Sequence, residues 1–352
     1  MNILVKRTLD ALIAGYFATN VFAIEVESKV ELRHDFSYKN AIVNIDQTSK
    51  YRTIAHDMID IEKKSGLTKT KYVLLDSLID EAKKSICIKE FYSKQDALKI
   101  LRTINQIILK NGFTFDECKL LSNGLNTRKI DCDMTSTIYL GIGEALNLPI
   151  SVVNVPGHEF VRWQDYNNVF NWETISAKEI SDLNYVILYD VSLTSLKKGV
   201  FLKTLNDKEI LSNVYFNLGS TCDVNGDFHD AIKYYNLSLK LNPNNQVAHF
   251  NLGNTLLKEE DTAQAFQEYK KSIDLDPNDA KAHFNKAVVL YLNGKLDDAI
   301  DGFNQSINLN PRDSDGYFAR ANVLLKQGYP CNAIKDYITG IGIFVYSLTF
   351  RR

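Results

Sequence analysis

The sequence predicts an α+β domain followed by an all-α superhelix of repeated helix pairs. The second half of the chain carries small, aromatic and proline residues with a period of 34, which is typical of stacked helical repeats. The first half places apolar residues at helical spacing and then alternates polar and apolar residues, as a strand does. The length of 352 residues also favours two domains over one.

The first part of the chain contains three stretches with helical periodicity, at residues 51–64, 72–86 and 94–110. Ser93 is a suitable N-cap for the third stretch, because its hydroxyl can accept from an amide of the first turn. A short loop is expected around residues 122–129. We expect the three helices to cover the back of the helix that follows this loop.

That next helix, from Cys132 to about Asn147, is where we place the candidate chemistry. Asp131 is a good N-cap, and Pro149 prevents the helix from continuing. Cys132 would then be the first helical residue, where the helix dipole favours a negative charge and lowers a thiol pKa. A thiolate also needs an imidazole to move protons and a third group to orient that imidazole.

The following stretch changes from helical to strand periodicity. Three short β-branched or alternating segments are candidate strands: residues 150–155, 158–164 and 169–175. With a turn near Asn167, His158 lies opposite a residue close to Glu173. Asn171 and Glu173 share one face of their strand because side chains alternate. The sequence therefore predicts that a helix-borne cysteine, a strand-borne histidine and a polar partner converge.

Four short motifs occur in order along this region: Asp131-Cys132-Asp133, Asn147-Leu148-Pro149, Val155-Pro156-Gly157-His158 and Asn171-Trp172-Glu173-Thr174. Over about residues 45–205 they resemble the transglutaminase-like superfamily, which has a papain-like cysteine-enzyme fold. The resemblance implies that Cys132 is the nucleophile and His158 the general acid and base. It places the third residue after the tryptophan, at Glu173, where the family has Asp. Asn171 is the alternative, because papain-like enzymes can use Asn in this role.

The second half of the chain consists of four repeats, at about residues 212–245, 246–279, 280–313 and 314–347. Each has a small residue on its first helix and an aromatic residue on its second. The paired positions are Gly219 with Tyr235, Gly253 with Tyr269, Ala287 with Phe303 and Ala321 with Tyr337. This is the tetratricopeptide pattern. A single unit cannot bury its apolar face, so we expect the four to stack into a superhelix.

An asparagine recurs on the first helix of three repeats, at Asn217, Asn251 and Asn285. The resemblance to tetratricopeptide folds implies that this position lines the concave groove. An amide offers both a donor and acceptors, so the three side chains could hold the backbone of an extended peptide. The alternative is that each asparagine only satisfies local backbone groups.

Composition narrows the classes of partner and cofactor. The net charge of −2 argues against nucleic acid as a partner. The five cysteines form no CxxC pair and no cluster with zinc-ligand spacing, so we expect no metal ion and no other cofactor. No segment is long enough and apolar enough for an integral membrane span. A protein or peptide bound to the repeats is the expected partner.

The predicted domain boundaries begin with a candidate signal peptide at residues 1–23. Lys6-Arg7 precede an apolar, small-residue-rich run that ends at Ala23, which favours an exported protein over an ordinary N-terminal helix. Residues 24–205 then form the transglutaminase-like domain, and residues 206–352 form the repeats.

Two functions fit the sequence. The first is a thiol enzyme that acts on amide or peptide bonds of a protein substrate, by acyl transfer or hydrolysis, with the repeats as its recruiting arm. The second is a protein–protein interaction scaffold that keeps the fold of the enzyme without its activity.

Overall fold

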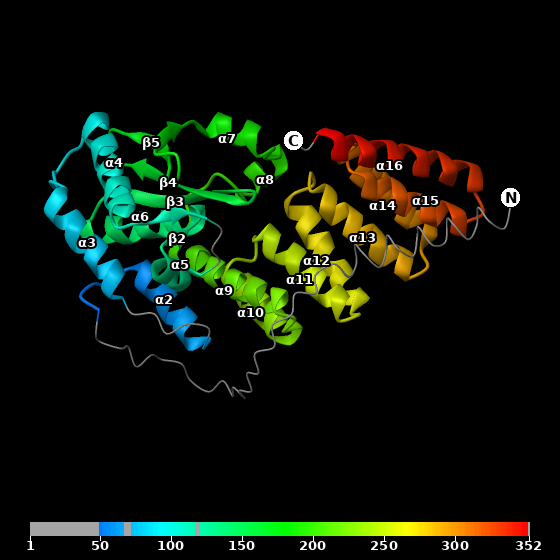
Figure 1. The fold of residues 1–352 in the computed structure, drawn as a ribbon, viewed down its shortest axis with the longest axis horizontal. Helices are drawn as coiled ribbons and strands as arrows, with labels where there is room; N and C mark the ends of the chain where they lie inside the picture. The colour runs from blue at the N-terminus through cyan, green and yellow to red at the C-terminus, as the bar shows by residue number, and fades with distance from the viewer. Residues whose placement is uncertain (1–48, 67–71, 117–119, 351–352) are drawn as a thin grey trace. The chain divides into compact units, whose positions relative to one another are not determined.

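The computed structural model describes residues 49–66, 72–116 and 120–350, the last four without their side chains (Figure 1). The candidate signal peptide, at residues 1–23, lies outside the described part. Thr48–Arg352 form one compact unit. Within the described ranges, no helix has the length and hydropathy required to cross a bilayer.

Among the described residues, five helices form the first part of this unit. They are α2 (Ile54–Lys64), α3 (Val73–Ser85), α4 (Lys94–Lys110), α5 (Leu121–Thr127) and α6 (Cys132–Leu146). Two short parallel strands, β1 (Thr114–Phe115) and β2 (Lys129–Ile130), lie between them in the chain. The start of α4 agrees with the prediction, because Ser93 accepts from the amide of Asp96. The prediction of a loop at residues 122–129 is wrong, since most of this segment forms α5. The buried Glu62 carboxylate accepts from the amides of Leu121 and Ser122 and thereby caps that helix.

Helix α6 is the central helix of the α+β part. It begins at Cys132, because Asp131 accepts from the Met134 amide at 3.0 Å as the N-cap. It ends at Leu146, and the C-cap residue Asn147 adopts a left-handed conformation with φ of 53°. Almost every side chain between Met134 and Gly143 is buried, which shows that neighbours enclose the helix on most sides.

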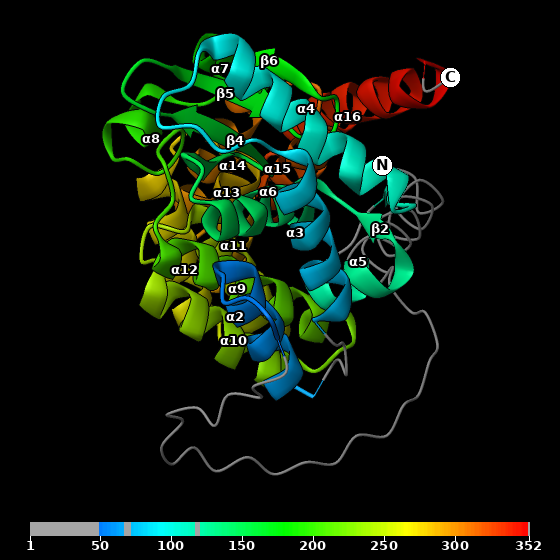
Figure 2. The same cartoon turned by 90° about the vertical axis from the view of Figure 1, so that its left-hand side faces the viewer.

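The sheet consists of four antiparallel strands in the order β3 (Ile150–Val155), β4 (His158–Gln164), β5 (Val169–Glu173) and β6 (Lys178–Ile180). Helix α6 lies against β3 and β4 (Figure 2). In the β4–β5 register Val161 pairs with Trp172 on one face, so the opposite face carries His158 and, diagonally across, Glu173. The predicted hairpin is therefore present, and its register brings these two side chains within reach of each other.

The two faces of the sheet belong to different apolar clusters. One face, with Trp163 and Trp172, packs on the helices α2 to α6, and the Trp172 indole donates to the Tyr139 hydroxyl at 3.2 Å. The other face, with Phe160, packs against α7 (Asp182–Leu188) and α8 (Leu193–Lys197). His158 and Glu173 lie on this second face, next to Tyr185 of α7.

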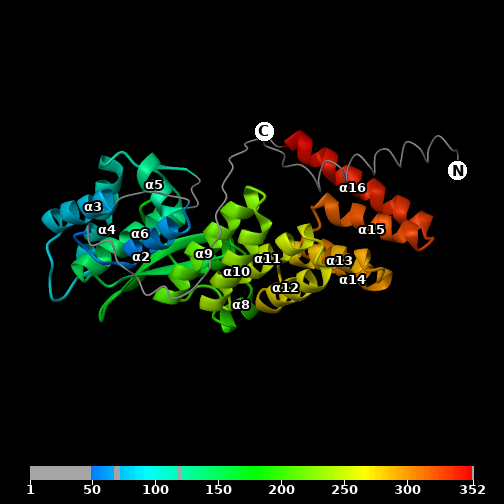
Figure 3. The same ribbon diagram turned by 90° about the horizontal axis from the view of Figure 1, so that it is seen from below.

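The described part of the repeats forms eight helices in consecutive pairs (Figure 3). The pairs are α9 (Asp207–Val224) with α10 (Phe228–Leu241), α11 (Gln246–Lys258) with α12 (Thr262–Leu275), α13 (Ala280–Leu292) with α14 (Leu296–Leu309), and α15 (Ser314–Lys326) with α16 (Pro330–Phe350). The small residue of the first helix lets the aromatic ring of the second pack on it. A Cβ atom at Gly219 would lie only 2.8 Å from the Tyr235 ring.

The first repeat shares a continuous core with the α+β part. Ile210, Val214 and Leu218 of α9 belong to the same buried cluster as Ile54 of α2. A polar contact also joins the α+β part to the second repeat. The Ser195 hydroxyl of α8 donates to Asp276, the C-cap residue of α12, at 3.0 Å. The segment between the sheet and the repeats is therefore ordered structure that joins the two parts.

Candidate functional site

A buried carboxylate–imidazole pair lies on the second face of the sheet. His158 Nε2 is 2.6 Å from Glu173 Oε2, and the Tyr185 hydroxyl donates to the same oxygen at 3.0 Å. The Tyr189 ring stacks parallel to the imidazole, with 5.2 Å between ring centroids. The histidine is thus oriented by a carboxylate on the next strand and held flat against a tyrosine ring.

The Glu173 carboxylate is stabilised in its charged form. Burial alone would raise its pKa. The hydrogen bonds from His158, Tyr185 and the Ile175 amide, with the charge of His158, outweigh that effect and lower the pKa. An ionised acceptor of this kind favours the histidine tautomer that donates through Nε2.

Asn171 does not contact His158. Its side-chain oxygen accepts from Arg162 Nε at 2.8 Å, and its amide donates to Asp182 Oδ1 at 2.7 Å. The sequence left two residues open as the partner that orients His158. The strand register brings Glu173 to the imidazole, whereas Asn171 hydrogen-bonds to the Arg162–Asp182 ion pair.

Cys132 lies half-buried at the start of α6. Its thiol donates to Asp133 Oδ1 at 3.3 Å. Burial, followed by the charge of Asp133, raises the thiol pKa far above its usual range, although the Glu159 backbone amide hydrogen-bonds to the sulfur and opposes this shift. The expectation that the helix dipole lowers this pKa is therefore wrong, because desolvation and nearby carboxylates outweigh a partial charge at one helix end.

Cys132 and His158 approach the same ring from different elements. His158 stacks on Tyr189, and burial, followed by the charges of Glu173 and Cys132, raises the pKa of the Tyr189 hydroxyl. Between these two described residues, however, no hydrogen bond joins the sulfur to the imidazole. The structure therefore brings the predicted cysteine and histidine into one neighbourhood without a direct proton path between them.

Two acids, the half-buried Asp133 and the buried Glu159, lie next to the thiol. Burial, followed by the charges of Asp133 and Asp131, raises the pKa of Glu159 well above 4.5, while the Asn213 amide opposes this shift. Burial also raises the pKa of Asp133. Neither acid was predicted as a site residue from the sequence. The available signal was the position of Glu159 on the strand face that otherwise carries apolar Val161 and Trp163.

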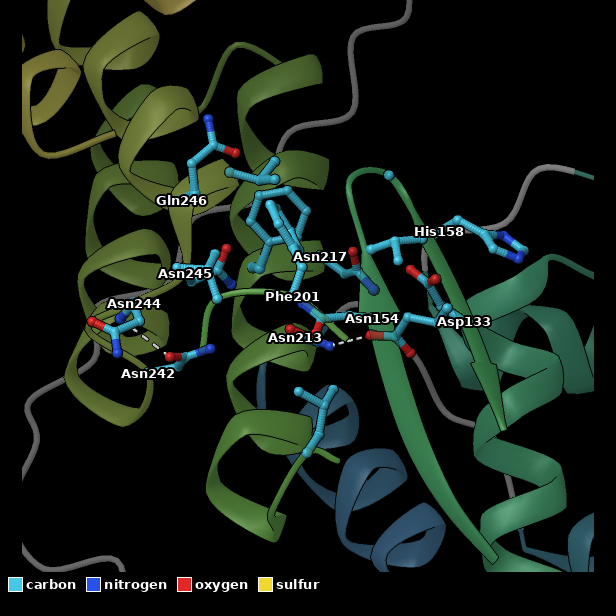
Figure 4. Close-up of a pocket in the computed structure, with 17 residues that line it drawn as sticks. Asp133, Asn154, His158, Phe201, Asn213, Asn217, Asn242, Asn244, Asn245 and Gln246 are labelled. Carbon is cyan, nitrogen blue, oxygen red and sulfur yellow. Dashed lines mark hydrogen bonds between the residues drawn. The ribbon is translucent and has the colours of Figure 1, made fainter. Parts of the chain in front are cut away.

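A cavity of about 140 Å³ lies between this acidic pair and the first two repeats (Figure 4). Amide side chains dominate its polar lining: Asn154, Asn213, Asn217, Asn242, Asn244, Asn245 and Gln246. The His158 backbone borders the cavity, but its ring points away from the asparagines. Within the described ranges, no group of three His, Cys, Asp or Glu side chains could hold a metal ion.

The three predicted peptide-binding asparagines have different surroundings. Asn217 is buried at the wall of the cavity. The Tyr235 hydroxyl interacts with Asn251, and Asn285 donates to Asn254 at 2.7 Å. The alternative of purely local backbone satisfaction does not describe the last two, because their partners are side chains of the neighbouring repeat.

Comparison with known proteins identifies the repeats. Two family models, both described as tetratricopeptide repeat, match residues 212–245 and residues 234–267 and 268–301. The chain therefore contains tetratricopeptide repeats, as predicted. Neither model extends to residues 45–205, so the transglutaminase-like resemblance has no support from them. No curated protein matches the chain.

Structures of MamA proteins are among the solved structures that match. One crystal structure of MamA protein is 29% identical to this chain. The match covers 38% of this chain and 72% of the MamA chain, with a TM-score of 0.36. Another crystal structure of MamA is 19% identical, covers 40% and 81%, and scores 0.39. MamA from Desulfovibrio magneticus RS-1 is 18% identical, covers 38% and 76%, and scores 0.37. Scores this low carry no argument about function.

Proposed function

We propose that the protein is an interaction scaffold whose repeats bind an extended segment of a protein partner. Tetratricopeptide repeats suggest a role in protein–protein interaction, and the observation that carries the proposal is the series of asparagines on consecutive first helices. Asn217, Asn251 and Asn285 lie on α9, α11 and α13. Each amide can donate to a peptide carbonyl and accept from a peptide amide.

Two of the three amides, Asn251 and Asn285, are fixed before a partner binds. Asn251 hydrogen-bonds with the Tyr235 hydroxyl. Asn254 Oδ1 accepts both from the Tyr269 hydroxyl at 2.8 Å and from Asn285 at 2.7 Å. Tyr269 is fully buried, so it anchors this network. A side chain that is already ordered loses less conformational entropy on binding, which supports a role in holding a ligand.

The surroundings of Cys132 also support binding over catalysis. A nucleophilic cysteine needs a lowered pKa and a base in contact with the sulfur. Here burial and Asp133 raise the thiol pKa, and the thiol donates to Asp133 instead of to His158. The scaffold needs none of these groups to react.

We expect the triple change Asn217→Ala, Asn251→Ala and Asn285→Ala to lower partner affinity by at least tenfold, because each lost backbone hydrogen bond weakens binding by about 0.5–1.5 kcal/mol. Random peptides displayed on phage are selected for binding to the full chain. The Kd of the best synthetic peptide is then measured by calorimetry.

Asn236→Ala is the matched control, because this asparagine is exposed on the second helix of repeat one. It should leave the Kd unchanged, as should Cys132→Ala. Failure to select any peptide, or equal binding by the triple variant, would overturn the scaffold proposal.

A second candidate function, thiol acyl transfer, rests on one observation. His158 is paired with a buried carboxylate at 2.6 Å, as a catalytic imidazole is. Under this proposal Cys132 would attack an amide or peptide carbonyl, and His158 would protonate the departing amine.

Alkylation of the cysteines separates the two proposals. We expect iodoacetamide at pH 7 to modify the exposed Cys87 and Cys331 faster than Cys132, because burial and Asp133 hold the Cys132 thiol protonated. Mass spectrometry of tryptic peptides gives the rate at each site. Cys222, which is buried, is the internal control for access. If Cys132 reacts first, and its reaction slows in the His158→Ala variant, the thiol enzyme becomes the better description.

A further inference from the structure

We propose that the cavity between the α+β part and the first repeats binds the cationic side chain, lysine or arginine, of the peptide segment that the repeats hold. This inference rests on the scaffold proposal and names the chemistry of its partner. Two carboxylates, those of Asp133 and Glu159, lie in the cavity wall.

Within the described part of the chain, these carboxylates have no cation of their own. Glu159 is 8% exposed, and its side chain accepts from the neutral amide of Asn213. Asp133 accepts from the Cys132 thiol. Across residues 49–66, 72–116 and 120–350, no lysine or arginine forms an ion pair with either acid. The charge of His158 acts on Asp133, but the imidazole is already paired with Glu173.

Such an arrangement is costly unless something else completes it. Buried carboxylates are normally paired, because an uncompensated charge loses its hydration without replacement. The cavity supplies the space for the missing partner, with a volume of about 140 Å³ next to both acids. At the cavity wall the Asn213 amide donates to the Glu159 carboxylate. Figure 4 shows Asn213, Asp133 and Asn154 around the same cavity.

The lining also holds an acceptor that lacks a donor. The side-chain oxygen of Asn154 is buried without a hydrogen-bond partner among the described residues. An ammonium or guanidinium carries three to five N–H donors and no acceptor, so it suits one orphan carbonyl and two carboxylates. The lining includes too few ligating side chains for a metal ion, since no group of three occurs in the described ranges.

The position of Asn217 links this cavity to the peptide path. Asn217 is one of the three asparagines proposed to hold a peptide backbone, and it also lines the cavity. A peptide that runs along the first helices would therefore pass the cavity opening at α9. One of its side chains could enter there, while Asn251 and Asn285 hold residues further along.

The test uses phage-displayed random nine-residue peptides selected in parallel on the wild-type full chain and on the Glu159→Gln and Asp133→Asn variants. We expect lysine or arginine to be enriched at one fixed position on the wild type and at no position on either variant. Norleucine in place of the selected lysine, or citrulline in place of arginine, should weaken binding to the wild type at least tenfold and leave binding to the variants unchanged.

Glu144→Gln is the matched control, because Glu144 lies at the other end of α6 and outside the cavity lining. It should retain the basic position. Circular dichroism confirms that each variant is folded. A basic position that persists equally in Glu159→Gln and Asp133→Asn would overturn the inference. Selected peptides that depend on the three asparagines but contain no basic residue would also overturn it, and they would leave the scaffold proposal intact. If no peptide is selected at all, both proposals fail.

A free amine could carry the same chemistry, and competition distinguishes the two sources. We expect n-butylamine and agmatine to displace the selected peptide only at concentrations far above its Kd, because they lack the backbone contacts. Displacement by either amine at concentrations comparable to the peptide would assign the cavity to a small amine and overturn the peptide inference.

Discussion

Replacing Gly253 by alanine is expected to lower the free energy of unfolding by about 1–3 kcal/mol, the usual cost of overpacking a core. A Cβ atom at this position would lie 2.7 Å from Tyr269 Cε1 and 2.9 Å from its Cδ1. The tyrosine cannot easily move away, because its ring is fully buried and its hydroxyl donates to Asn254. Urea denaturation followed by circular dichroism gives the change.

Gly342→Ala provides the matched control, since a Cβ there would meet no atom within 4 Å. Gly342 is exposed on α16, so alanine should stabilise by up to about 1 kcal/mol through its higher helix propensity. The Tyr269 ring of the Tyr269–Asn254–Asn285 network packs directly on Gly253. We therefore also expect Gly253→Ala to weaken binding of the selected peptide. Equal stability of the two glycine variants would contradict the close packing between α11 and α12.

Glu159→Gln is expected to make the protein more stable than the wild type at pH 8. In the folded state, burial, followed by the charges of Asp133 and Asp131, raises the Glu159 pKa well above 4.5. A carboxyl with a raised pKa binds its proton more tightly in the folded state, so its contribution to stability is fully present below about pH 4.5. That contribution is lost as the pH rises through the folded pKa, and the loss is about 1.4 kcal/mol for every pH unit that separates the folded pKa from the unfolded one.

Glutamine has no proton to lose and can still accept from Asn213, so the variant should escape this loss. The advantage should shrink as the pH is lowered toward 4.5. Thermal unfolding from pH 4.5 to 8 measures it.

Glu173→Gln is the control with the opposite sign. The contacts of Glu173 with His158 and Tyr185 outweigh its burial and lower its pKa, so its carboxylate stabilises the fold above about pH 4.5. That contribution disappears as the pH falls through the folded pKa. The glutamine variant should therefore lose stability at neutral pH. Destabilisation of Glu159→Gln at pH 8 would show that Glu159 has a partner other than those described.

The Glu159 experiment also bears on the cationic site. A residue at a cavity wall that costs stability in the free protein is typical of a binding site. If Glu159→Gln gains stability and loses the preference for basic peptides, both results have one cause, which is a carboxylate that lacks its cation until the peptide binds.

Much of the local structure could be predicted from the sequence. Apolar spacing and the Ser93 cap predicted the bounds of α4. A β-branched run predicted β3, and alternating side chains predicted β4. The loop expected at residues 122–129 was wrong because α5 depends on Glu62, which lies about 60 residues earlier and accepts from two amides at its start. Periodicity within a short window cannot detect a cap supplied from such a distance.

The candidate site could be predicted only in part. Side-chain alternation placed Glu173 and Asn171 on one face, and the strand register then separated their roles. The thiol pKa was predicted in the wrong direction, because the helix dipole is readable from Asp131-Cys132 while burial is not. Tyr185, Glu159 and Asn213 reach the site from three different elements, and no short motif connects them.

The sequence by itself determined the tetratricopeptide repeats, the positions of α2, α3, α4 and α6, and those of β3 to β5, because these follow from residue spacing along the chain. Only the tertiary structure decided the electrostatics, since the pKa of Cys132, Glu159 and Glu173 depends on which distant charges and amides surround each group after burial. The folded surroundings decide whether a sulfur at the start of a helix is reactive. They also decide whether a glutamate in a strand has a partner.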